Sequence, residues 1–225
     1  MSNDLVNADF AQRVVIATNT LPWTPSPQAG VERRLLDRIG GEVARATSLV
    51  RYAGASAFPA HQHGLGEEFL VLDGVFSDEH GDYPKGTYVR NPPGSSHTPR
   101  TAPGCTILVK LRQMQPSESA RVVIDTAAAE WEPGEAPGLS RLPLHLDRDT
   151  GERVALERFA PGTHLSDVDC PGGEEIFLLS GALKDEYGSY AAGTWIRNPA
   201  GFRHRLESSE GATYWVKRGH LRPAS

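Results

Sequence analysis

The sequence predicts an all-β protein that consists of two similar domains in tandem. The chain has 225 residues, of which 23 are glycine and 17 are proline, and this composition is typical of many short strands joined by tight turns. No segment has the periodicity of a long amphipathic helix. The length suits two domains of about 110 residues, each large enough to form its own core.

An internal repeat supports the division into two domains. Two blocks of the first half recur in the second half at a constant offset of 107 residues, namely 67–74 with 174–181 and 86–97 with 193–204. A third pair, 14–16 with 122–124, has an offset of 108 residues, so a single deletion separates it from the others. Because the repeat covers nearly the whole chain, we expect a first domain over residues 1–116 and a second over residues 117–225.

Turn residues and short apolar runs define the first expected strands. A pair of glycines precedes a segment rich in β-branched residues at 42–52, and a short apolar run at 69–72 is stopped by Gly74. The segment 35–39 fits a helical turn and an exposed strand equally well. These features predict strands at 42–52 and 69–72, and they do not decide between a helical turn and a strand at 35–39.

The later elements follow the same pattern. Residues 77–82 have the composition of a turn, and residues 87–90 are expected to form a short strand that ends at the turn sequence 91–94. The polar segment 115–119 contains a proline, as is common in a linker between two copies. These patterns predict that each copy consists of short strands joined by tight turns.

Three histidines and one glutamate form the most informative motif in the chain. His61 and His63 share one face of a strand, because side chains at i and i+2 point the same way. Glu67 follows after a glycine-containing turn, and His97 comes from a distant part of the sequence. Neutral imidazoles with one carboxylate suit Fe, Mn, Ni, Co or Zn better than Ca or Mg. We expect these four residues to bind one divalent transition metal ion.

The interpretation as a metal site has simpler alternatives. An isolated histidine is more commonly a surface residue or a hydrogen-bonded core residue, and a lone pair of histidines is weak evidence for a metal. Glu68 is a rival to Glu67 as the carboxylate ligand, although the spacing from Gly74 favours Glu67. The joint occurrence of all four residues favours metal binding.

The second copy lacks two of these residues. In the repeat alignment, Val168 replaces His61 and Cys170 replaces His63, so that Cys170, Glu174 and His204 remain. We expect a degenerate, metal-free site, although the nearby His164 and Asp169 leave open a rebuilt site that binds a second ion. Cys170 is equally compatible with a small buried apolar residue.

The motif resembles that of a known family. Gly54, His61-x-His63, Glu67 and Gly74, followed by Gly86, Pro92, Gly94 and His97, are similar to the two cupin motifs in residue type and spacing. Residues 66–83 and 90–97 further resemble the ChrR-like subgroup, which is named for the cupin half of an anti-sigma factor. The resemblance covers both halves and implies a tandem bicupin, with an antiparallel jelly-roll barrel (a double-stranded β-helix) in each copy and metal ligands that point into the barrel.

The resemblance leaves the function open between three classes. The leading hypothesis is a metal-dependent oxidoreductase, most simply a dioxygenase, that acts on a small organic molecule. The alternative is a ChrR-like regulatory or stress-sensing protein, but the helical zinc-binding region that would hold a sigma factor has no counterpart in the sequence. The third is a binding or storage protein without turnover. No residue beyond the metal ligands is identified as catalytic.

The composition and net charge argue against some classes of binding partner. The net charge is −5 without a long basic run, which argues against nucleic acid as a partner. No run approaches the ~20 apolar residues of a membrane span, and the first twenty residues lack the pattern of a secretory signal. The two cysteines lie in different halves, as suits a reducing compartment. We expect a cytoplasmic protein with a small-molecule ligand, and the sequence leaves homo-oligomer formation open.

Overall fold

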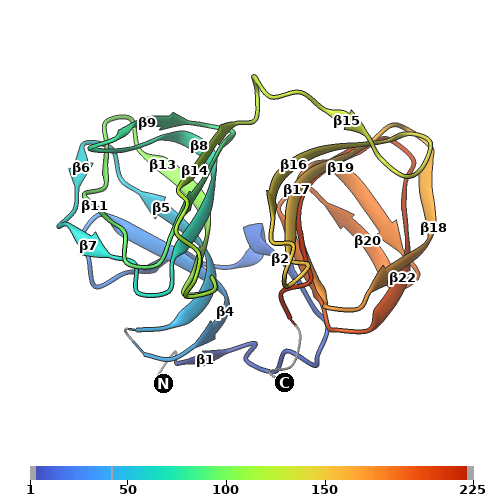
Figure 1. Cartoon of the computed structure of the whole chain (residues 1–225), viewed down its shortest axis with the longest axis horizontal. Coiled ribbons are helices and arrows are strands. Elements are labelled where there is room, and N and C mark those ends of the chain that lie inside the picture. The colour runs from blue at the N-terminus through green and yellow to red at the C-terminus, as the bar shows by residue number, and fades with distance from the viewer. Residues whose placement is uncertain (1–3, 42, 222–225) are drawn as a thin grey trace. The chain divides into compact units, whose positions relative to one another are not determined.

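The computed structural model describes residues 4–41 and 43–221. The described residues form β-strands and one short 3-10 helix, η1 (Thr18–Thr20), without an α-helix (Figure 1). They divide into two compact units: the first takes its residues from Met1–Ala8 and Pro22–Ala129, and the second from Asp9–Leu21 and Glu130–Ser225. The all-β architecture in two parts is as the sequence predicted.

Unit 1 is built on an antiparallel sheet with the strand order β1-β4-β5-β13-β8-β10-β14. Shorter strands form the opposite face, where β7 pairs with β11 and β12 pairs with β6 and β8. The strands are β1 (Leu5–Val6), β3 (Thr24–Pro25), β4 (Val31–Ile39), β5 (Arg45–Tyr52), β6 (Ser56–Ala57), β7 (His61–Gln62), β8 (Glu67–Asp78), β9 (Gly81–Pro84), β10 (Thr87–Asn91), β11 (Ser96–His97), β12 (Arg100–Thr101), β13 (Cys105–Leu111) and β14 (Val122–Asp125).

Unit 2 repeats this architecture with the order β15-β16-β17-β23-β19-β21-β2, and β18 pairs with β22 on the opposite face. The strands are β2 (Val14–Ala17), β15 (Glu132–Pro133), β16 (Leu139–Leu146), β17 (Arg153–Phe159), β18 (Thr163–Cys170), β19 (Glu174–Asp185), β20 (Gly188–Ala191), β21 (Thr194–Asn198), β22 (Phe202–Ser208) and β23 (Ala212–Arg218). The two faces of each unit enclose its apolar core.

The two units exchange one strand each. Strand β14 follows the first repeat in sequence but completes the sheet of unit 1, with Ile124 opposite Tyr88 on β10. In the same way β2 belongs to the first repeat in sequence but pairs with β21 of unit 2, with Val15 opposite Ile196. The compact units therefore differ from a simple division at residues 116/117, because such a cut separates both strands from their partners.

Most expected elements of unit 1 are present. The segment 35–39 is part of strand β4, and the expected strand at 42–52 is observed as β5 from Arg45 to Tyr52. Residue 42 lies outside the described residues. The expected turn at 77–82 contains the β8–β9 hairpin, in which Asp78 pairs with Gly81.

The prediction that Gly74 ends a strand is wrong. Strand β8 continues through Gly74 to Asp78. Gly74 has a φ of +72° and lies beside a register shift in the pairing with β13. A side chain at Gly74 would overlap the carbonyl oxygen of Gly104. The glycine therefore bends the strand at a bulge and lets it pass to the opposite face of the barrel.

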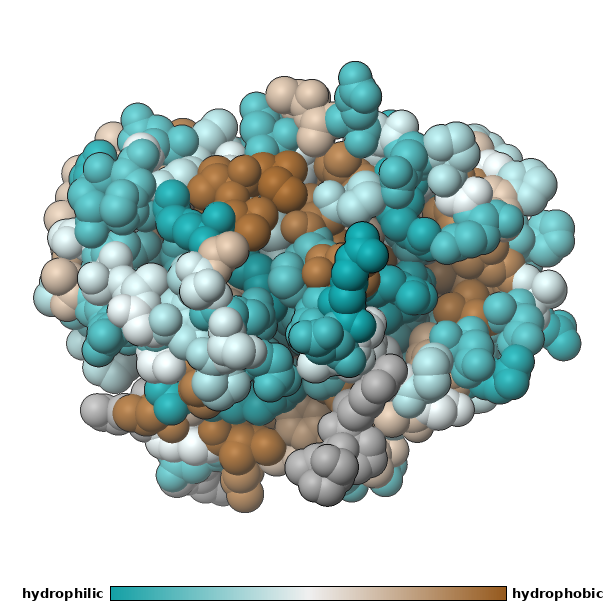
Figure 2. Space-filling view, in the orientation of Figure 1, coloured by the Kyte–Doolittle hydropathy of each residue, from teal (hydrophilic) through white to brown (hydrophobic). Residues whose placement is uncertain are grey.

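The core of unit 1 lies between its two faces and supports one side of a cavity. It contains Phe69, Val71, Phe76, Val89 and Ile107, which are almost completely buried. Figure 2 shows hydrophobic side chains on the visible surface as separate patches among polar residues. None of the described helices has the length and hydrophobicity needed to cross a membrane.

Candidate metal centre

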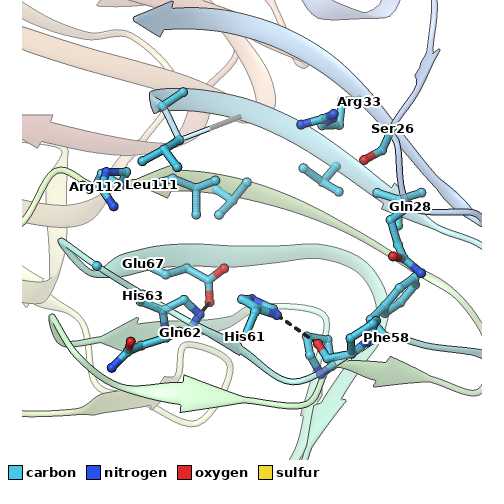
Figure 3. A pocket seen from close by; sticks show the side chains of 18 of the residues that line it. Ser26, Gln28, Arg33, Phe58, His61, Gln62, His63, Glu67, Leu111 and Arg112 are labelled. Atoms are coloured by element: carbon cyan, nitrogen blue, oxygen red, sulfur yellow. Dashed lines mark hydrogen bonds and ion pairs between the residues drawn. The ribbon is translucent and has the colours of Figure 1, made fainter. Parts of the chain in front are cut away.

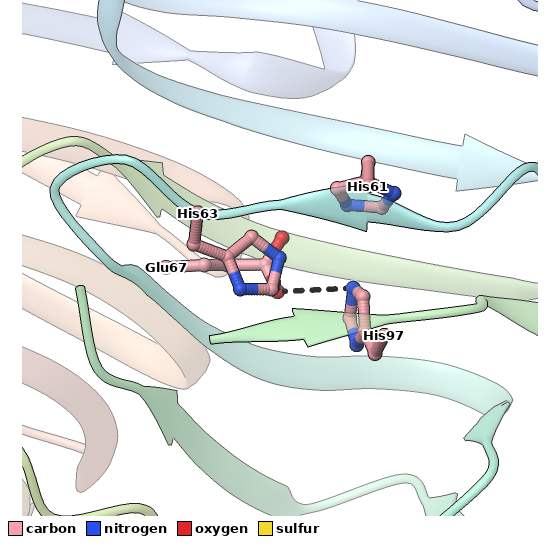
Figure 4. Close-up of side chains that lie close together, drawn as sticks. All are labelled: His61, His63, Glu67 and His97. Atoms are coloured by element: carbon pink, nitrogen blue, oxygen red, sulfur yellow. Dashed lines mark ion pairs between the residues drawn. The ribbon is translucent and has the colours of Figure 1, made fainter. Parts of the chain in front are cut away.

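The four residues singled out by the sequence converge in unit 1 (Figure 4). His61 on β7 lies directly opposite His97 on β11, His63 follows β7, and Glu67 begins β8. One ligand atom from each of these four residues lies within 4.8 Å of all the others. A single ion between them could therefore contact all four side chains. The rival carboxylate, Glu68, instead forms an ion pair with Arg90.

Two imidazole nitrogens at this centre have no hydrogen-bond partner among the described residues. His63 Nε2 and His97 Nε2 are buried without a hydrogen bond, and they lie 3.4 and 3.5 Å from Glu67 Oε2. A buried polar atom without a partner is costly in free energy. A metal ion would satisfy both nitrogens and the carboxylate at once, so the residues present fit a divalent metal.

The other ring nitrogens are held by acceptors. His63 Nδ1 lies 3.0 Å from Ser95 Oγ, whose own hydroxyl donates to the carbonyl of Pro92. His97 Nδ1 lies 3.3 Å from Asp78 Oδ2. These acceptors favour the tautomer with hydrogen on Nδ1, which leaves the Nε2 lone pair directed at the centre.

The carboxylate ligand and the third histidine are also oriented. The Asn91 side chain donates a hydrogen bond of 3.1 Å to Glu67 Oε2, and His61 Nδ1 lies 3.3 Å from the carbonyl oxygen of Pro59. Asp78, Asn91 and Ser95 were not among the functional residues predicted from the sequence. A signal existed for Asp78 and Asn91, because the repeat retains both as Asp185 and Asn198.

Burial sets the charge of the histidines. It lowers the pKa of His63 to about 4, helped by the nearby His61. It also lowers the pKa of His97, although the charge of Glu67 opposes that shift. Burial opposes ionisation of Asp78, but hydrogen bonds from Tyr83 and from the His80 amide lower the net pKa of that carboxyl. At neutral pH the centre therefore combines the neutral imidazoles of His63 and His97, as metal ligation requires, with an anionic Asp78.

A cavity of about 470 Å³ opens beside the centre (Figure 3). His61 is exposed whereas His63, Glu67 and His97 are buried, so the centre is accessible from the His61 side. The cavity is lined by both apolar and polar side chains, and its volume is in the usual range for small-molecule sites. Its apolar lining includes Val31, Val50, Phe58, Val109 and Leu111, and its polar lining includes Ser26, Gln28, Arg33, Tyr52 and Arg112.

Unit 2 contains the remnant that the sequence predicted. Cys170, Glu174 and His204 bring their ligand atoms within 4.8 Å of one another. Val168 lies opposite His204, as His61 lies opposite His97 in unit 1. His164, a candidate for a rebuilt site, is exposed and does not belong to the cluster.

A buried arginine neutralises this remnant. Arg218 Nε lies 2.7 Å from Glu174 Oε2, and His204 Nε2 lies 3.1 Å from Glu174 Oε1. Although burial opposes ionisation, the Arg218 charge and the His204 hydrogen bond lower the pKa of Glu174 to about 2. Burial, with the negative charge of Glu174, raises the pKa of Cys170 and keeps it a thiol. The guanidinium thus supplies the positive charge that a metal would bring.

The two similar β units, of which the first carries a cluster of four residues of metal-ligand type and the second a cluster of three, define the molecule as a tandem cupin protein. The model of the ChrR cupin-like domain matches residues 11–115 and 119–222. The chain therefore belongs to the ChrR cupin-like family, as the sequence resemblance indicated. No curated protein sequence matches the chain significantly.

Solved structures share the fold at low sequence identity. A protein from Nostoc punctiforme, provisionally named a dioxygenase, is 18% identical with a TM-score of 0.80, and the match covers 95% of this chain and 85% of that one. A provisionally named glyoxylate-induced protein from Pseudomonas aeruginosa is 13% identical with a TM-score of 0.76, covering 100% and 92%. Oxalate decarboxylase from Lactobacillus farciminis is 11% identical with a TM-score of 0.64, covering 93% and 87%.

Proposed function

We propose that unit 1 binds one divalent transition metal ion through His61, His63, Glu67 and His97, and that the protein is a metal-dependent enzyme for a small organic molecule. The observation that carries the proposal is that the Nε2 atoms of His63 and His97 are buried without a hydrogen bond among the described residues and lie 3.4 and 3.5 Å from Glu67 Oε2. Oxygenation is the leading reaction type. The metal, whether Fe, Mn, Ni or Zn, would supply Lewis-acid or redox chemistry.

The accessibility of the centre favours catalysis over a purely structural role. Structural metal sites are closed by protein ligands, whereas catalytic sites keep a position open for water or substrate. Here the exposed His61 faces a cavity large enough for a small molecule. Ser95, Asp78 and Asn91 would hold the ligands in place while that open side accepts the substrate.

The names of the structural neighbours are compatible with this class of reaction. One is provisionally named a dioxygenase and another is an oxalate decarboxylase. The regulatory alternative is supported by the family name, because ChrR is an anti-sigma factor. This regulatory alternative requires a change of conformation or of partner binding when the metal is removed. Identical hydrogen-exchange patterns in metal-free and metal-loaded protein would exclude it.

The first experiment is elemental analysis of protein purified without chelator or metal-affinity resin. We expect about one transition metal ion per chain, and about none in His97→Ala protein, because that variant removes one of the buried ligands. The matched control is His204→Ala, which removes the equivalent histidine of unit 2. Thermal melts would show that each variant is folded. Two ions per chain, or full metal content in His97→Ala protein, would contradict the proposal.

A further inference from the structure

Two arginines line the metal cavity, Arg33 and Arg112, and neither forms an ion pair with an acidic side chain among the described residues. Arg33 lies on β4 with its side chain in the cavity lining, across from His61 in Figure 3. Its neighbours on the strand point the other way: Glu32 pairs with Arg51, and Arg34 stacks on the ring of Trp23. Among the described residues, no acidic side chain forms an ion pair with Arg33.

The charge of Arg33 is retained although its surroundings oppose it. Partial burial and the neighbouring Arg38 guanidinium lower the pKa of Arg33. An arginine nonetheless stays protonated at physiological pH, because its ordinary pKa is above 12. Arg33 therefore places an uncompensated positive charge on the cavity wall, and its planar fork is suited to bidentate contact with a carboxylate.

Unit 2 shows which group fits this position. Register pairing places Arg33 opposite Val50 in unit 1 and Arg141 opposite Glu157 in unit 2. Arg141 Nη2 lies 2.9 Å from Glu157 Oε1. The repeat thus builds a carboxylate beside this arginine in one unit and replaces it with valine in the other. The valine leaves space for a carboxylate that comes from a ligand.

A second hydrogen-bond donor lies close to Arg33. Tyr52 on β5 faces the same cavity, two residues along the strand from Val50, which is the register partner of Arg33. Side chains in this diagonal relation lie within reach of a shared partner. No described group forms a hydrogen bond with the Tyr52 hydroxyl. Burial and the charge of Glu67 raise the pKa of Tyr52, so the phenol remains a donor.

Two further positions in the cavity wall are apolar in unit 1 and charged in unit 2. Val50 and Leu111 line the cavity, whereas the equivalent residues of unit 2, Glu157 and Arg218, form an ion pair of 2.8 Å with each other. Unit 2 therefore fills with its own charged side chains the region that is apolar in unit 1. A ligand of the unit 1 cavity needs an apolar body as well as an anionic group.

We infer that the substrate class is a small carboxylic acid with an apolar body, whose carboxylate binds Arg33 and the Tyr52 hydroxyl while its body extends past Val50 toward the metal centre. This inference rests on the proposed function, because it assigns a substrate to the same site. It places the carboxylate at the end of the cavity opposite the histidines, so that the reacting part of the molecule faces them.

The test compares acids with matched amides by isothermal titration calorimetry. Hexanoate and benzoate are titrated against hexanamide and benzamide, into metal-loaded and chelator-treated protein. We expect each acid to bind at least about tenfold more tightly than its amide in both forms. Arg33→Gln should weaken acid binding by about ten- to a hundredfold and leave amide binding unchanged, since a hydrogen bond to a charged group is worth more than a neutral one.

Matched variants separate recognition from folding. Arg34→Gln removes the same charge from the neighbouring residue on the outer face and should leave the acid preference intact. Tyr52→Phe should weaken acid binding by about two- to tenfold. Val50→Glu should install the carboxylate that unit 2 already has, pair with Arg33 and abolish acid binding. This last variant tests the idea even where Arg33→Gln disturbs folding.

Three outcomes would overturn the inference. These are the absence of an acid preference, an acid preference that survives both Arg33→Gln and Val50→Glu, and acid binding that disappears on metal removal, which would place the carboxylate on the ion. Metal content is measured on the same samples. A wild-type chain without bound metal would refute the proposed function, whereas a chain with one ion and no acid preference would refute only the inference.

Discussion

The two units have the same strand pairings but different charges at corresponding positions. In unit 1, Val50 and Leu111 leave an apolar cavity beside Glu67 and three histidines. In unit 2, the equivalents Glu157 and Arg218 fill that region and form ion pairs with each other and with the conserved carboxylate of the repeat, Glu174. The two units therefore place different groups around the buried glutamate of the repeat: histidines in unit 1 and an arginine in unit 2.

The negative charge of this glutamate requires a positive charge nearby, because a buried carboxylate without a cation is strongly unfavourable in free energy. In unit 2 the cation is the side chain of Arg218, which pairs with the carboxylates of Glu157 and Glu174. Unit 1 has an uncharged leucine at the same position and neutral histidines around Glu67. The two sites therefore differ at four corresponding positions, because Val50, His61, His63 and Leu111 of unit 1 are replaced by Glu157, Val168, Cys170 and Arg218 in unit 2.

Replacing the internal cation should have the largest effect. Arg218→Leu copies unit 1 but leaves Glu157 and Glu174 buried without their shared partner. We expect unfolding free energy to fall by about 3–5 kcal/mol, the usual cost of breaking a buried ion pair from one side. Urea denaturation followed by circular dichroism measures this change.

The control removes the charges together. A triple variant, Arg218→Leu with Glu157→Val and Glu174→Gln, should recover much of the lost stability, because no buried charge is left unpaired. Leu111→Met in unit 1 should change the unfolding free energy only slightly. If Arg218→Leu is as stable as wild type, then the charge network does not maintain unit 2 and the comparison fails.

Acid should weaken unit 2 through the same residue. The pKa of Glu174 is lowered from 4.5 to about 2 in the folded protein, so the unfolded state binds more protons between these values. The stabilisation is present above about pH 4.5 and is lost as the pH falls toward 2. We expect a loss on the order of 2–3 kcal/mol, measured as the dependence of unfolding free energy on pH.

The Glu174→Gln variant serves as the reference for this titration. It lacks the carboxyl that takes up the proton, so its stability should depend less steeply on pH over the same interval. Equal slopes in the two proteins would assign the acid sensitivity to other groups, with Glu157 as the first alternative because its pKa is also lowered.

The sequence predicted the fold and the converging ligands because both are encoded locally or by the repeat. His61, His63 and Glu67 lie within one short segment, and the constant spacing to His97 indicates that the four act together. Their side chains converge because β7 and β11 pair with His61 opposite His97. Whether they bind a metal stays a prediction.

The features that the sequence did not reveal depend on contacts between distant residues. The partner of Arg218 is Glu157, 61 positions away, and no local pattern connects them. The strand exchange was also hidden, because residues 14–16 and 122–124 have nearly the same sequence and either could in principle complete either sheet. The structure resolves this ambiguity by pairing β14 with β10 and β2 with β21.

The smallest expected effect concerns the carboxylate behind the metal ligands. Asp78 and Asp185 each accept a hydrogen bond from a tyrosine and pair with an arginine, namely Tyr83 and Arg121 in unit 1 and Tyr190 and Arg13 in unit 2. In addition, Asp78 Oδ2 lies 3.3 Å from His97 Nδ1, whereas His204 Nδ1 has no hydrogen-bond partner within the described residues. Asp78 therefore contacts the histidine of its unit, and Asp185 does not.

Asp78→Asn should lower the metal affinity of the chain by about ten- to a hundredfold, because an amide is a weaker acceptor for the histidine N–H and makes the imidazole a poorer ligand. Asp185→Asn changes the same charge at the equivalent position and should leave metal affinity unchanged while lowering stability. Competition with a chromogenic chelator measures the affinity, and thermal melts report on folding. Equal losses of metal affinity in the two variants would show that the carboxylate acts through the stability of the whole chain and not through His97.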